Sequence, residues 1–567
     1  MTVKEREQQL LSWFTDSVHK WNTWRQTAYR DRQYYEGVQW TSSEAEELQR
    51  LGQPVITVNH LWSKINSLVG MMLQQQPTIK CLPRGKADTL LASIATSVIR
   101  YVLDVNQFQQ SLTDIMTDML TTGIGWAEVR ITPFLSHDPI TVEHVPFDEV
   151  IFDPLSRKTD FSDARFVFRG RWIEKDLVPR YYPQARRHVE EVLSLPSSSV
   201  PAPLDLWLDT TRNLVFVLEA QYRDFSAEEV VWDGVQAERY IPELHDDLIA
   251  LGLLSKETMV IPVTRRAVLV AGRLILDEPL PYAFQSFTLI PFVAYRNLSG
   301  YPLSLVSIVK DIQDEINKRR SKTLHYLQAK RVIALEGAVA DPDDFMEELR
   351  RPDAFLTVRR LDSVRIEDDL NLSVQHFTLM QEAVNEMSLI TGIYPDFLGQ
   401  PTNARTGAAL RVRILQSQNS VQRYFSALER GLKQVAERVL ALAKQYYHSD
   451  RIRQIVDISE DFRTQINWQT DVPQIRNTLA ALRADIVVKV TQGGLTERQE
   501  QLIQLVELMK VLPPDLVAMS IDVLLDAFDL PQKETIKSRL AQLIQLRMQF
   551  AVQTAGGDGN GRGTERD

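Results

Sequence analysis

The sequence contains a single cysteine, Cys81, among its 567 residues. One cysteine can form neither a disulfide within the chain nor a zinc site built from several cysteines, which is typical of proteins from a reducing compartment. The sequence also lacks any run of about 18 apolar residues, the length that a membrane-spanning helix requires. Its first ten residues are charged and polar, unlike a secretory signal. These absences predict a protein of a reducing, aqueous compartment.

The chain also lacks an excess of positive charge. Its 64 Lys and Arg residues stand against 74 Asp and Glu residues, which gives a formal net charge of −10. A protein that coats nucleic acid is usually basic overall, so the sequence argues against that class while leaving room for local basic contacts. The length is too great for one core and predicts two to four domains.

Motifs of catalysis are missing as well. The glycines of Gly123–Gly125 precede a strand, whereas a dinucleotide-binding glycine motif opens a helix, so we interpret them as a tight turn. His137 and Asp138 lie in an expected turn, and Glu143 and His144 point to opposite faces of one strand, which does not favour a metal site. The sequence therefore predicts no catalytic residue, no cofactor and no metal.

What the sequence does contain is a change of period along its first half. Up to about residue 121 apolar residues recur every three to four positions, as in helices, and afterwards every second position, as in strands. The expected helices are 1–35, one capped at Thr41 or Ser42, 58–74, 86–108, 109–121 and 176–195. The expected strands are 126–131, 140–145, 165–171, 214–222, 229–232, 260–271 and 287–295. This order predicts an α+β fold, predominantly helical, with a mostly antiparallel sheet.

The first of these helices is unusually rich in aromatic residues. Trp13, Trp21, Trp24 and Tyr35 can share one face, which must pack against something apolar. Two interpretations stand equally: the helix docks on the core of its own chain, or it contacts another subunit.

In the second half, two helices of similar length bracket a small insertion. The first starts near Pro302, carries Leu305, Val309, Ile312 and Ile316 on one seam, and ends in the basic cluster Lys318, Arg319, Arg320 and Lys322. The second covers 373–391, with Phe377, Met380, Val384 and Met387 at the same spacing. Between them we expect strands at 332–335 and 355–358 and a helix at 342–350.

A stretch without acidic residues follows. Residues 397–428 include Arg405, Arg411, Arg413 and Arg423 but no Asp or Glu. The stretch opens as a loop bounded by Gly399 and Gly407 and continues as a helix whose apolar residues repeat every three to four positions. A strand at 485–490, helices at 496–511, 514–529 and 532–550, and a disordered tail at 555–567 complete the expected elements.

Several segments stand out in this order along the chain: Asp31–Trp40, Gln53–Asn59, Gly70, Gln76-Pro77, Thr122–Val129, Phe152-Asp153-Pro154 and Lys310–Lys322. Together they resemble the portal proteins of short-tailed bacteriophages, and Lys310–Lys322 is the most diagnostic of them. The match is collinear from about residue 15 to 450.

The resemblance implies a ring of twelve subunits at one capsid vertex, through which DNA is packaged and ejected. It implies a wing at 1–302, a first stem helix at 303–322, a clip at 323–372 and a second stem helix at 373–392. A tunnel loop at 393–409, a long wing helix and return strand at 410–490, and a crown at 491–554 would follow, without a long C-terminal coiled coil.

The resemblance also implies functional residues and partners. Arg405, Asn403, Arg411 and Arg413 would contact double-stranded DNA without reading its sequence. Lys318, Arg319, Arg320, Lys322, Arg350, Arg351, Arg359 and Arg360 would contact partners at the clip and stem. The implied partners are further copies of the chain, the terminase, the major capsid and scaffolding proteins, and tail adaptor proteins. The protein would belong to the virion, and to the host cytoplasm during assembly.

Two alternatives belong to other classes. The chain would be a nucleic-acid-processing enzyme if some of its many acids formed a metal-dependent site. It would be a non-viral scaffold or adaptor if the aromatic N-terminus drove its assembly.

Overall fold

The computed structural model describes most of residues 2–489. The described ranges are 2–74, 78–83, 89–132, 138–193, 207–209, 211–232, 237–328, 330–349, 351, 353–368, 370–394, 407–447, 451–452, 455 and 484–489. The expected helices at 496–511, 514–529 and 532–550 and the tail at 555–567 lie outside these ranges. Among the described residues, no helix combines the length and the apolar character needed to cross a bilayer.

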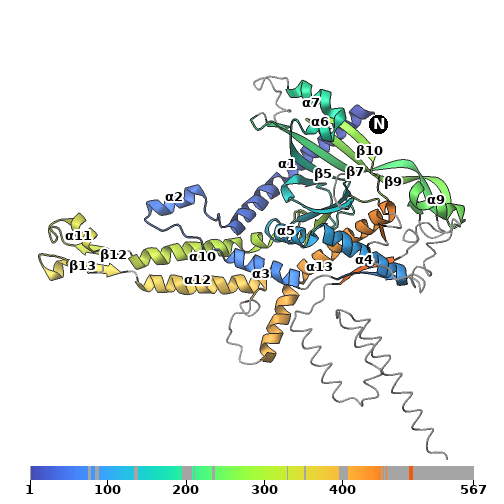
Figure 1. The fold of residues 1–567 in the computed structure, drawn as a ribbon. Helices are drawn as coiled ribbons and strands as arrows, with labels where there is room; N and C mark the ends of the chain where they lie inside the picture. The colour runs from blue at the N-terminus through green and yellow to red at the C-terminus, as the bar shows by residue number, and fades with distance from the viewer. Residues whose placement is uncertain are drawn as a thin grey trace, which may run out of the picture. The chain divides into compact units, whose positions relative to one another are not determined.

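Helix α1 (Val3–Glu36) opens the chain (Figure 1). Thr2 caps its start: the Thr2 hydroxyl accepts from the Glu5 backbone N–H, and the Glu5 carboxylate accepts from the Thr2 N–H, the reciprocal pair of a capping box. The helix ends at Gly37, whose φ of +96° glycine adopts without steric cost. Four further helices follow α1 in the chain before strand β2: α2 (Ser42–Arg50), α3 (His60–Gln74), α4 (Thr89–Val105) and α5 (Phe108–Thr122).

The larger sheet is antiparallel and has the strand order β10-β9-β7-β5-β4, with β6 and β8 paired to β7. Its strands are β4 (Val150–Phe152), β5 (Phe166–Glu174), β6 (Leu208–Asp209), β7 (Leu214–Trp232), β8 (Ala237–Arg239), β9 (Ser255–Val270) and β10 (Arg273–Pro279). The two strands predicted at 214–222 and 229–232 form one strand, because β9 pairs with β7 without interruption from Val217 to Trp232. The helix predicted at 176–195 is divided by Pro183 into α6 (Val178–Tyr181) and α7 (Arg186–Leu193); α9 (Pro242–Ala250) was not predicted.

A smaller antiparallel sheet has the order β11-β2-β3, formed by β11 (Leu289–Phe292), β2 (Gly125–Ile131) and β3 (Ile140–Val145). The Gly123–Gly125 turn leads from α5 into strand β2 of this sheet, as predicted. Gly123 has a φ of +93°, and a Cβ on this residue would lie 2.9 Å from the Leu303 backbone. The turn thus serves close backbone packing.

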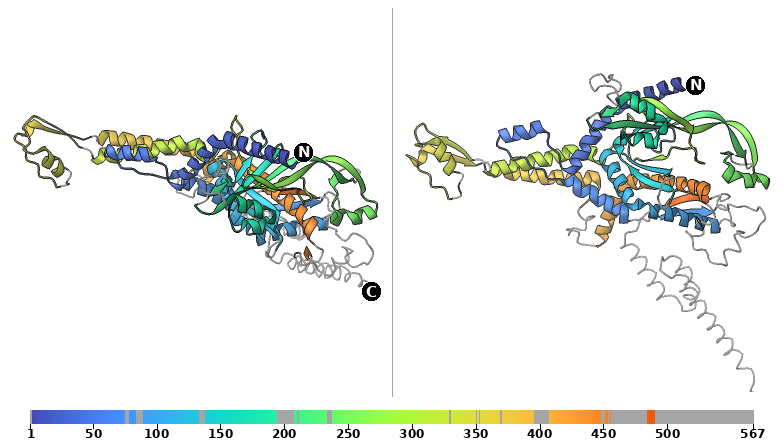
Figure 2. Two further views of the ribbon diagram at one scale, coloured as in Figure 1. Left: turned by 90° about the horizontal axis from the view of Figure 1, so that it is seen from above. Right: turned by 45° about the horizontal axis from the view of Figure 1, so that its top comes forward.

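Helix α1 lies against the larger sheet, where Figures 1 and 2 place it beside β5 and β10. Trp13 stacks on Phe166 with ring centroids 4.8 Å apart, and the Trp21 indole N–H donates to the Phe152 carbonyl over 2.7 Å. Trp21 and Trp24 are buried within this chain. The aromatic face therefore belongs to the core of its own chain, which decides between the two interpretations of the sequence.

The second part of the core surrounds helix α13 (Gly407–Tyr446), which packs on α4 and β11. Gly431 lets the helix approach the sheet closely, because a Cβ there would lie 2.2 Å from the Phe292 ring. Strand β1 (Thr78–Pro83) pairs with β14 (Ala484–Lys489) close to this helix, and the single cysteine, Cys81, is buried in β1.

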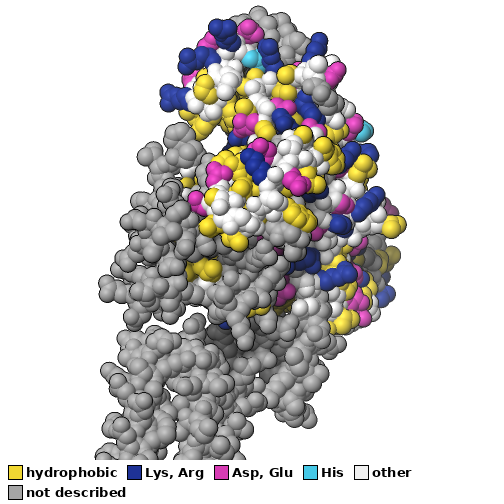
Figure 3. Space-filling model, turned by 90° about the vertical axis from the view of Figure 1, so that its right-hand side faces the viewer, with side chains coloured by type: hydrophobic (Ala, Val, Ile, Leu, Met, Phe, Trp, Pro, Cys, Tyr) yellow, Lys and Arg dark blue, Asp and Glu magenta, His cyan; other side chains and the backbone are white. Residues whose placement is uncertain are grey.

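The charges on one face of the described part are mixed. On the face seen in Figure 3, Lys and Arg side chains are interspersed with Asp, Glu and apolar side chains, and no broad region of one sign forms there. This distribution agrees with the small net charge of the sequence relative to its length.

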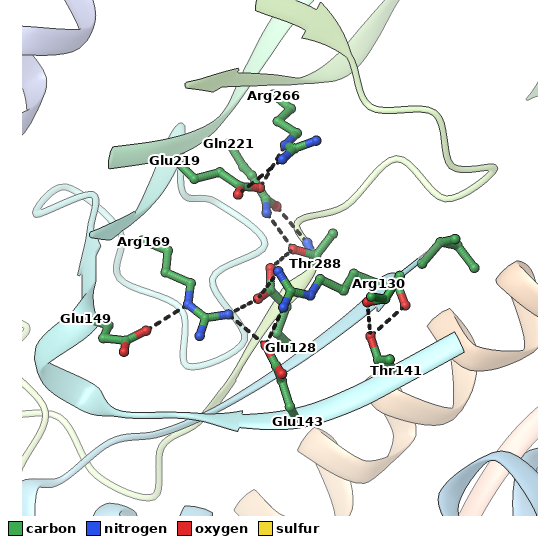
Figure 4. A network of polar contacts seen from close by, with 12 residues as sticks. Glu128, Arg130, Thr141, Glu143, Glu149, Arg169, Glu219, Gln221, Arg266 and Thr288 are labelled. Carbon is green, nitrogen blue, oxygen red and sulfur yellow. Dashed lines mark hydrogen bonds and ion pairs between the residues drawn. The ribbon is translucent and has the colours of Figure 1, made fainter. Parts of the chain in front are cut away.

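A buried ionic network joins the two sheets (Figure 4). Arg169 of β5 donates to Glu128 of β2, to Glu143 of β3 over 3.0 Å and to Glu149 over 2.9 Å. The Thr288 hydroxyl donates to the other Glu128 oxygen over 2.8 Å. Burial alone would raise the pKa of Glu128, but the guanidinium groups of Arg169 and Arg130 and the hydrogen bonds outweigh it and hold this pKa below its usual range.

We predict that Glu128→Gln destabilises the fold by about 3 kcal/mol. The change removes the buried carboxylate that pairs with the Arg169 guanidinium, which is 8% exposed, and leaves only the carboxylates of Glu143 and Glu149, which are more exposed to solvent. The measurement is the midpoint of urea unfolding followed by tryptophan fluorescence. Since the folded-state pKa of Glu128 is depressed, its contribution is present at neutral pH and is lost as the pH falls below about 4.

The matched control is Glu278→Gln. Glu278 lies 3.8 Å from Arg266 and is 43% exposed, so this change is expected to cost less than about 1 kcal/mol. Equal midpoints for the two variants would show that the network does not hold the sheets together.

Candidate functional site: a helix pair and its insertion

Helices α10 (Leu305–Gln328) and α12 (Leu370–Thr391) form an antiparallel pair, visible side by side in Figures 1 and 2. The Ser373 hydroxyl donates to the Thr323 carbonyl over 3.5 Å, and His376 stacks on Tyr326 with centroids 5.5 Å apart. The predicted seam of α10 is confirmed at Leu305, Val309 and Ile316, which are buried, and Ile312 is partly buried.

The seam of α12 and the end of α10 differ from the prediction. Met387 is buried and Met380 and Val384 are partly buried, but Phe377 is 42% exposed. Helix α10 continues to Gln328 instead of ending at Lys322, because the intervening residues include neither Gly nor Pro and Tyr326 packs on α12. The insertion between the helices is therefore shorter than the expected 323–372.

A second face of α10 is held by buried polar groups. The Ser304 hydroxyl donates to the Asp31 carboxylate over 2.7 Å, and the Ser307 hydroxyl donates to the same carboxylate. Lys310 lies 3.4 Å from Asp31, so this nearly inaccessible carboxylate is neutralised as well as hydrogen-bonded.

Further along the same face, hydrogen bonds continue to the segment 39–58. The Asn317 amide donates to Gln39 Oε1 over 2.6 Å, and Asn317 Oδ1 accepts from the Val58 N–H over 2.9 Å. Gln313 donates to the Val58 carbonyl over 2.8 Å. Gln313 and Asn317 are both buried, so these bonds fix one position of α10 along its axis: a shift would leave buried amides unpaired.

The four residues of the basic cluster at the end of the predicted helix differ in burial and in ion pairing. Arg319 forms an ion pair with Glu315 one turn earlier and Arg320 is partly buried, whereas Lys318 and Lys322 are exposed. Neither lysine has an ion-pair or hydrogen-bond partner among the described residues. They border an open groove of about 400 Å³ lined by Asp311, Asp314, Glu315, Lys318, Arg319, Lys322 and His376. Burial lowers the pKa of His376, and Arg319 and Lys322 lower it further.

The insertion consists of β12 (Lys330–Ala334), α11 (Pro342–Glu348) and β13 (Val364–Asp368), with β12 and β13 paired antiparallel. The predicted strand at 355–358 is wrong: these residues form no regular element, and β13 is the partner of β12. Among its described residues the insertion buries Ala338, Phe345 and Leu349, while Phe355 is 85% and Leu361 90% exposed. Such uncovered apolar side chains on a small element are typical of a contact surface.

The predicted arginines of the insertion are only partly available. Arg351 forms an ion pair with Glu348 over 2.9 Å, and Arg359 and Arg360 are exposed. Arg350 lies outside the described residues. Arg359 and Arg360 therefore remain the candidates for contacts with a partner.

The side chains of the predicted DNA-contact residues are not described by the structure. Asn403 and Arg405 lie outside the described residues, and Arg411 and Arg413 lie in the first turns of α13, where the side chains are not described. Ahead of these residues, the C-terminal end of α12 is held by Lys64 of α3, which donates to the Ser388 hydroxyl over 2.7 Å and to the Ile393 carbonyl. Burial lowers the pKa of Lys64 to about 8, since no carboxylate among the described residues pairs with it.

The residues considered for a metal are separated in the fold. His144 contacts Asp118 over 2.8 Å, Glu143 contacts Arg130 and Arg169, and Asp138 accepts from the Tyr447 hydroxyl. His137 is outside the described residues. Within the described ranges, no three His, Cys, Asp or Glu side chains are grouped as a metal site requires.

Comparison with known proteins completes the assignment. No curated protein matches the chain. A model of the family described as "Phage P22-like portal protein" matches residues 11–556, nearly the whole chain. The described part is a mixed α+β fold. The chain therefore belongs to the P22-like family of phage portal proteins, the proteins of the capsid vertex that serve DNA packaging.

Proposed function

We propose that twelve copies of this chain form the ring through which the phage genome is packaged and later ejected. The family match over residues 11–556 carries the proposal, since this family assembles homo-oligomeric rings associated with capsid and DNA. The family is structural and not one of enzymes, so the ring guides DNA without altering it covalently.

The proposal assigns a role to each part of the chain. Residues 1–302 form the wing, α10 and α12 the stem, and the insertion between them the clip. Residues 393–409 form the tunnel loop, 410–490 the long wing helix and return strand, and 491–554 the crown. The assignment of stem and clip is supported by the antiparallel pairing of α10 with α12 and by the separate strand pair β12–β13 of the insertion.

The charges suit a channel that DNA must slide through. A net charge of −10 per subunit repels the phosphate backbone, and this prevents DNA from adhering to the ring. A few arginines per subunit, repeated around the ring, attract phosphates weakly from all sides and keep the duplex centred. Each such contact is screened by salt and carries no sequence information, which sliding requires.

In this proposal the clip docks the terminase during packaging and tail adaptor proteins afterwards. Exposed Phe355 and Leu361 offer apolar contact area, and Arg359 and Arg360 offer donors for carboxylates. The capsid and scaffolding proteins would meet other parts of the ring. Assembly would take place in the host cytoplasm before the ring becomes part of the virion.

We predict that the purified chain assembles into particles whose mass, measured by native mass spectrometry, is twelve times 65.0 kDa. Helices α10 and α12 each keep an uncovered side in the single chain, which adjacent copies would cover. A stable monomer at micromolar concentration would contradict the proposal.

We predict that Arg405→Ala leaves ring assembly unchanged but impairs DNA packaging or retention. Arg405 lies between Gly399 and Gly407 in the loop expected from the sequence, so its loss should remove a phosphate contact without removing a packing contact. The measurement is the amount of genome-length DNA in particles assembled with the variant in place of the wild type. Arg405→Lys keeps the charge and serves as the control; normal packaging by both variants would exclude Arg405 from the DNA contact.

We predict that Arg359→Glu with Arg360→Glu weakens binding of the tail adaptor in a pull-down by at least about tenfold, as reversal of two exposed charges at an interface would. Arg212→Glu reverses a charge that is 79% exposed and belongs to the wing, and it should leave binding unchanged. Unchanged adaptor binding by the Arg359/Arg360 variant would show that these residues lie outside the contact.

A further inference from the structure

The α10–α12 pair leaves one stripe of each helix uncovered, and the two stripes differ in charge. Along α10 the accessible residues follow a spacing of three and four: Ile308, Asp311, Glu315, Lys318 and Lys322. This is the spacing of a helix face that packs along a neighbouring helix. Among the described residues, Lys318 interacts electrostatically with Glu44 of α2 and with Asp314, but it forms no ion pair with either. The second half of the stripe is basic: residues 317–328 contain four Lys and Arg and no Asp or Glu.

Helix α12 has the opposite character. Glu382 and Glu386 are its only Asp, Glu, Lys or Arg residues, and both are exposed. Beside them Leu389 is 65% and Ile390 50% exposed, whereas Ala383 and Met387 are buried. The acidic and apolar residues of α12 therefore occupy the part of the helix surface that α10 does not cover.

The two stripes do not satisfy each other within one chain. Neither Lys318 nor Lys322 forms an ion pair with Glu382 or with any other described residue, although all three belong to one helix pair. Exposed charges alone would need no partner, but Ile308, Leu389 and Ile390 add apolar side chains, 40%, 65% and 50% exposed, to the same surfaces. The α10 stripe is acidic at Asp311 and Glu315 and basic at Lys318 and Lys322, so its basic half is complementary to the acidic residues of α12 in a second copy of the chain.

The pairing within the chain fixes which residues lie at the same height along the two helices. Ser373 lies opposite Thr323 and His376 opposite Tyr326, and the helices are antiparallel. Glu382 is nine residues beyond Ser373 and six beyond His376, so it lies level with residues 314–320 of α10, the stretch that contains Lys318. By the same count Leu389 lies level with residues 307–313, which include Ile308.

Rotation about an axis that runs along the helix pair keeps every residue at its own height. In a ring built around such an axis, α12 of one copy faces α10 of the next in a head-to-tail contact. We propose that Glu382 of each subunit forms an ion pair with Lys318 of the adjacent subunit, while Leu389 and Ile390 pack near Ile308 of that subunit. This inference rests on the ring assembly proposed above and names its contact surface.

The proposal separates Glu382 from its neighbour Glu386. Glu386 is thirteen residues beyond Ser373 and ten beyond His376, so it lies level with residues 310–316, which include Asp311, Asp314 and Glu315. Reversing the charge of Glu382 should therefore weaken assembly, whereas reversing that of Glu386 should leave it unchanged or strengthen it. The two glutamates share one helix face and similar exposure, so they form a matched pair.

The test uses two variants of the full-length chain, Lys318→Glu and Glu382→Lys, with ring formation measured by native mass spectrometry over a concentration series. In Lys318→Glu both contact surfaces are acidic at this height, and in Glu382→Lys both are basic, so each variant alone should need a several-fold higher concentration to assemble. Mixing the two restores opposite charges at every contact, and alternating rings should form at the wild-type concentration. Glu386→Lys is the control, and circular dichroism checks that each variant is folded.

The outcomes separate this inference from the proposed function. If the wild-type chain forms no ring, the proposed assembly fails. If the wild-type ring forms but the mixture assembles no better than either variant alone, or if Glu386→Lys is as defective as Glu382→Lys, the ring stands and the pairing of Glu382 with Lys318 is wrong.

Discussion

The position of α10 is the constraint on which the rest of this structure depends. Its polar face is fixed by Ser304, Gln313 and Asn317, which donate to Asp31, Val58 and Gln39, residues more than 250 positions earlier in the chain. Apolar packing alone would tolerate small shifts of a helix along its axis, whereas buried amides and carboxylates lose bonding partners at once. Because α12 packs on α10 and the insertion connects the two, this face also sets the position of the pair and of the strands at its end.

In the body of the chain, too, apolar contacts and buried polar contacts have different roles. Aromatic side chains of α1 supply apolar area against the larger sheet, and the network around Glu128 and Arg169 specifies how that sheet meets the smaller one. The aromatic contacts and the ionic network therefore join the parts of the body that carries the α10–α12 pair. For a ring of identical subunits this matters, since small errors of orientation in one subunit add up around the ring.

The sequence predicted the elements with strong periodicity and missed those that depend on distant partners. Helix α1, strands β2 and β3 and helix α12 follow from regular spacing, and the portal family follows from collinear segments. The strand expected at 355–358 has local strand propensity but no pairing partner among the described residues. Strand β13, whose residues alternate apolar and charged, was not predicted and pairs with β12. Likewise the sequence identified Lys318, Arg319 and Lys322 as one cluster, but only the fold shows that Glu315 pairs with Arg319 and leaves the two lysines exposed.

A cryo-electron microscopy reconstruction of the assembled chain tests most directly whether the α10–α12 pair forms the stem of the ring, as we propose. We predict a closed ring in which each α12 lies beside α10 of the adjacent subunit along the channel, with residues 330–368 at one mouth. A ring whose subunits meet through the β7–β9 ribbon or α1, with the α10–α12 pairs separated from one another, would contradict it.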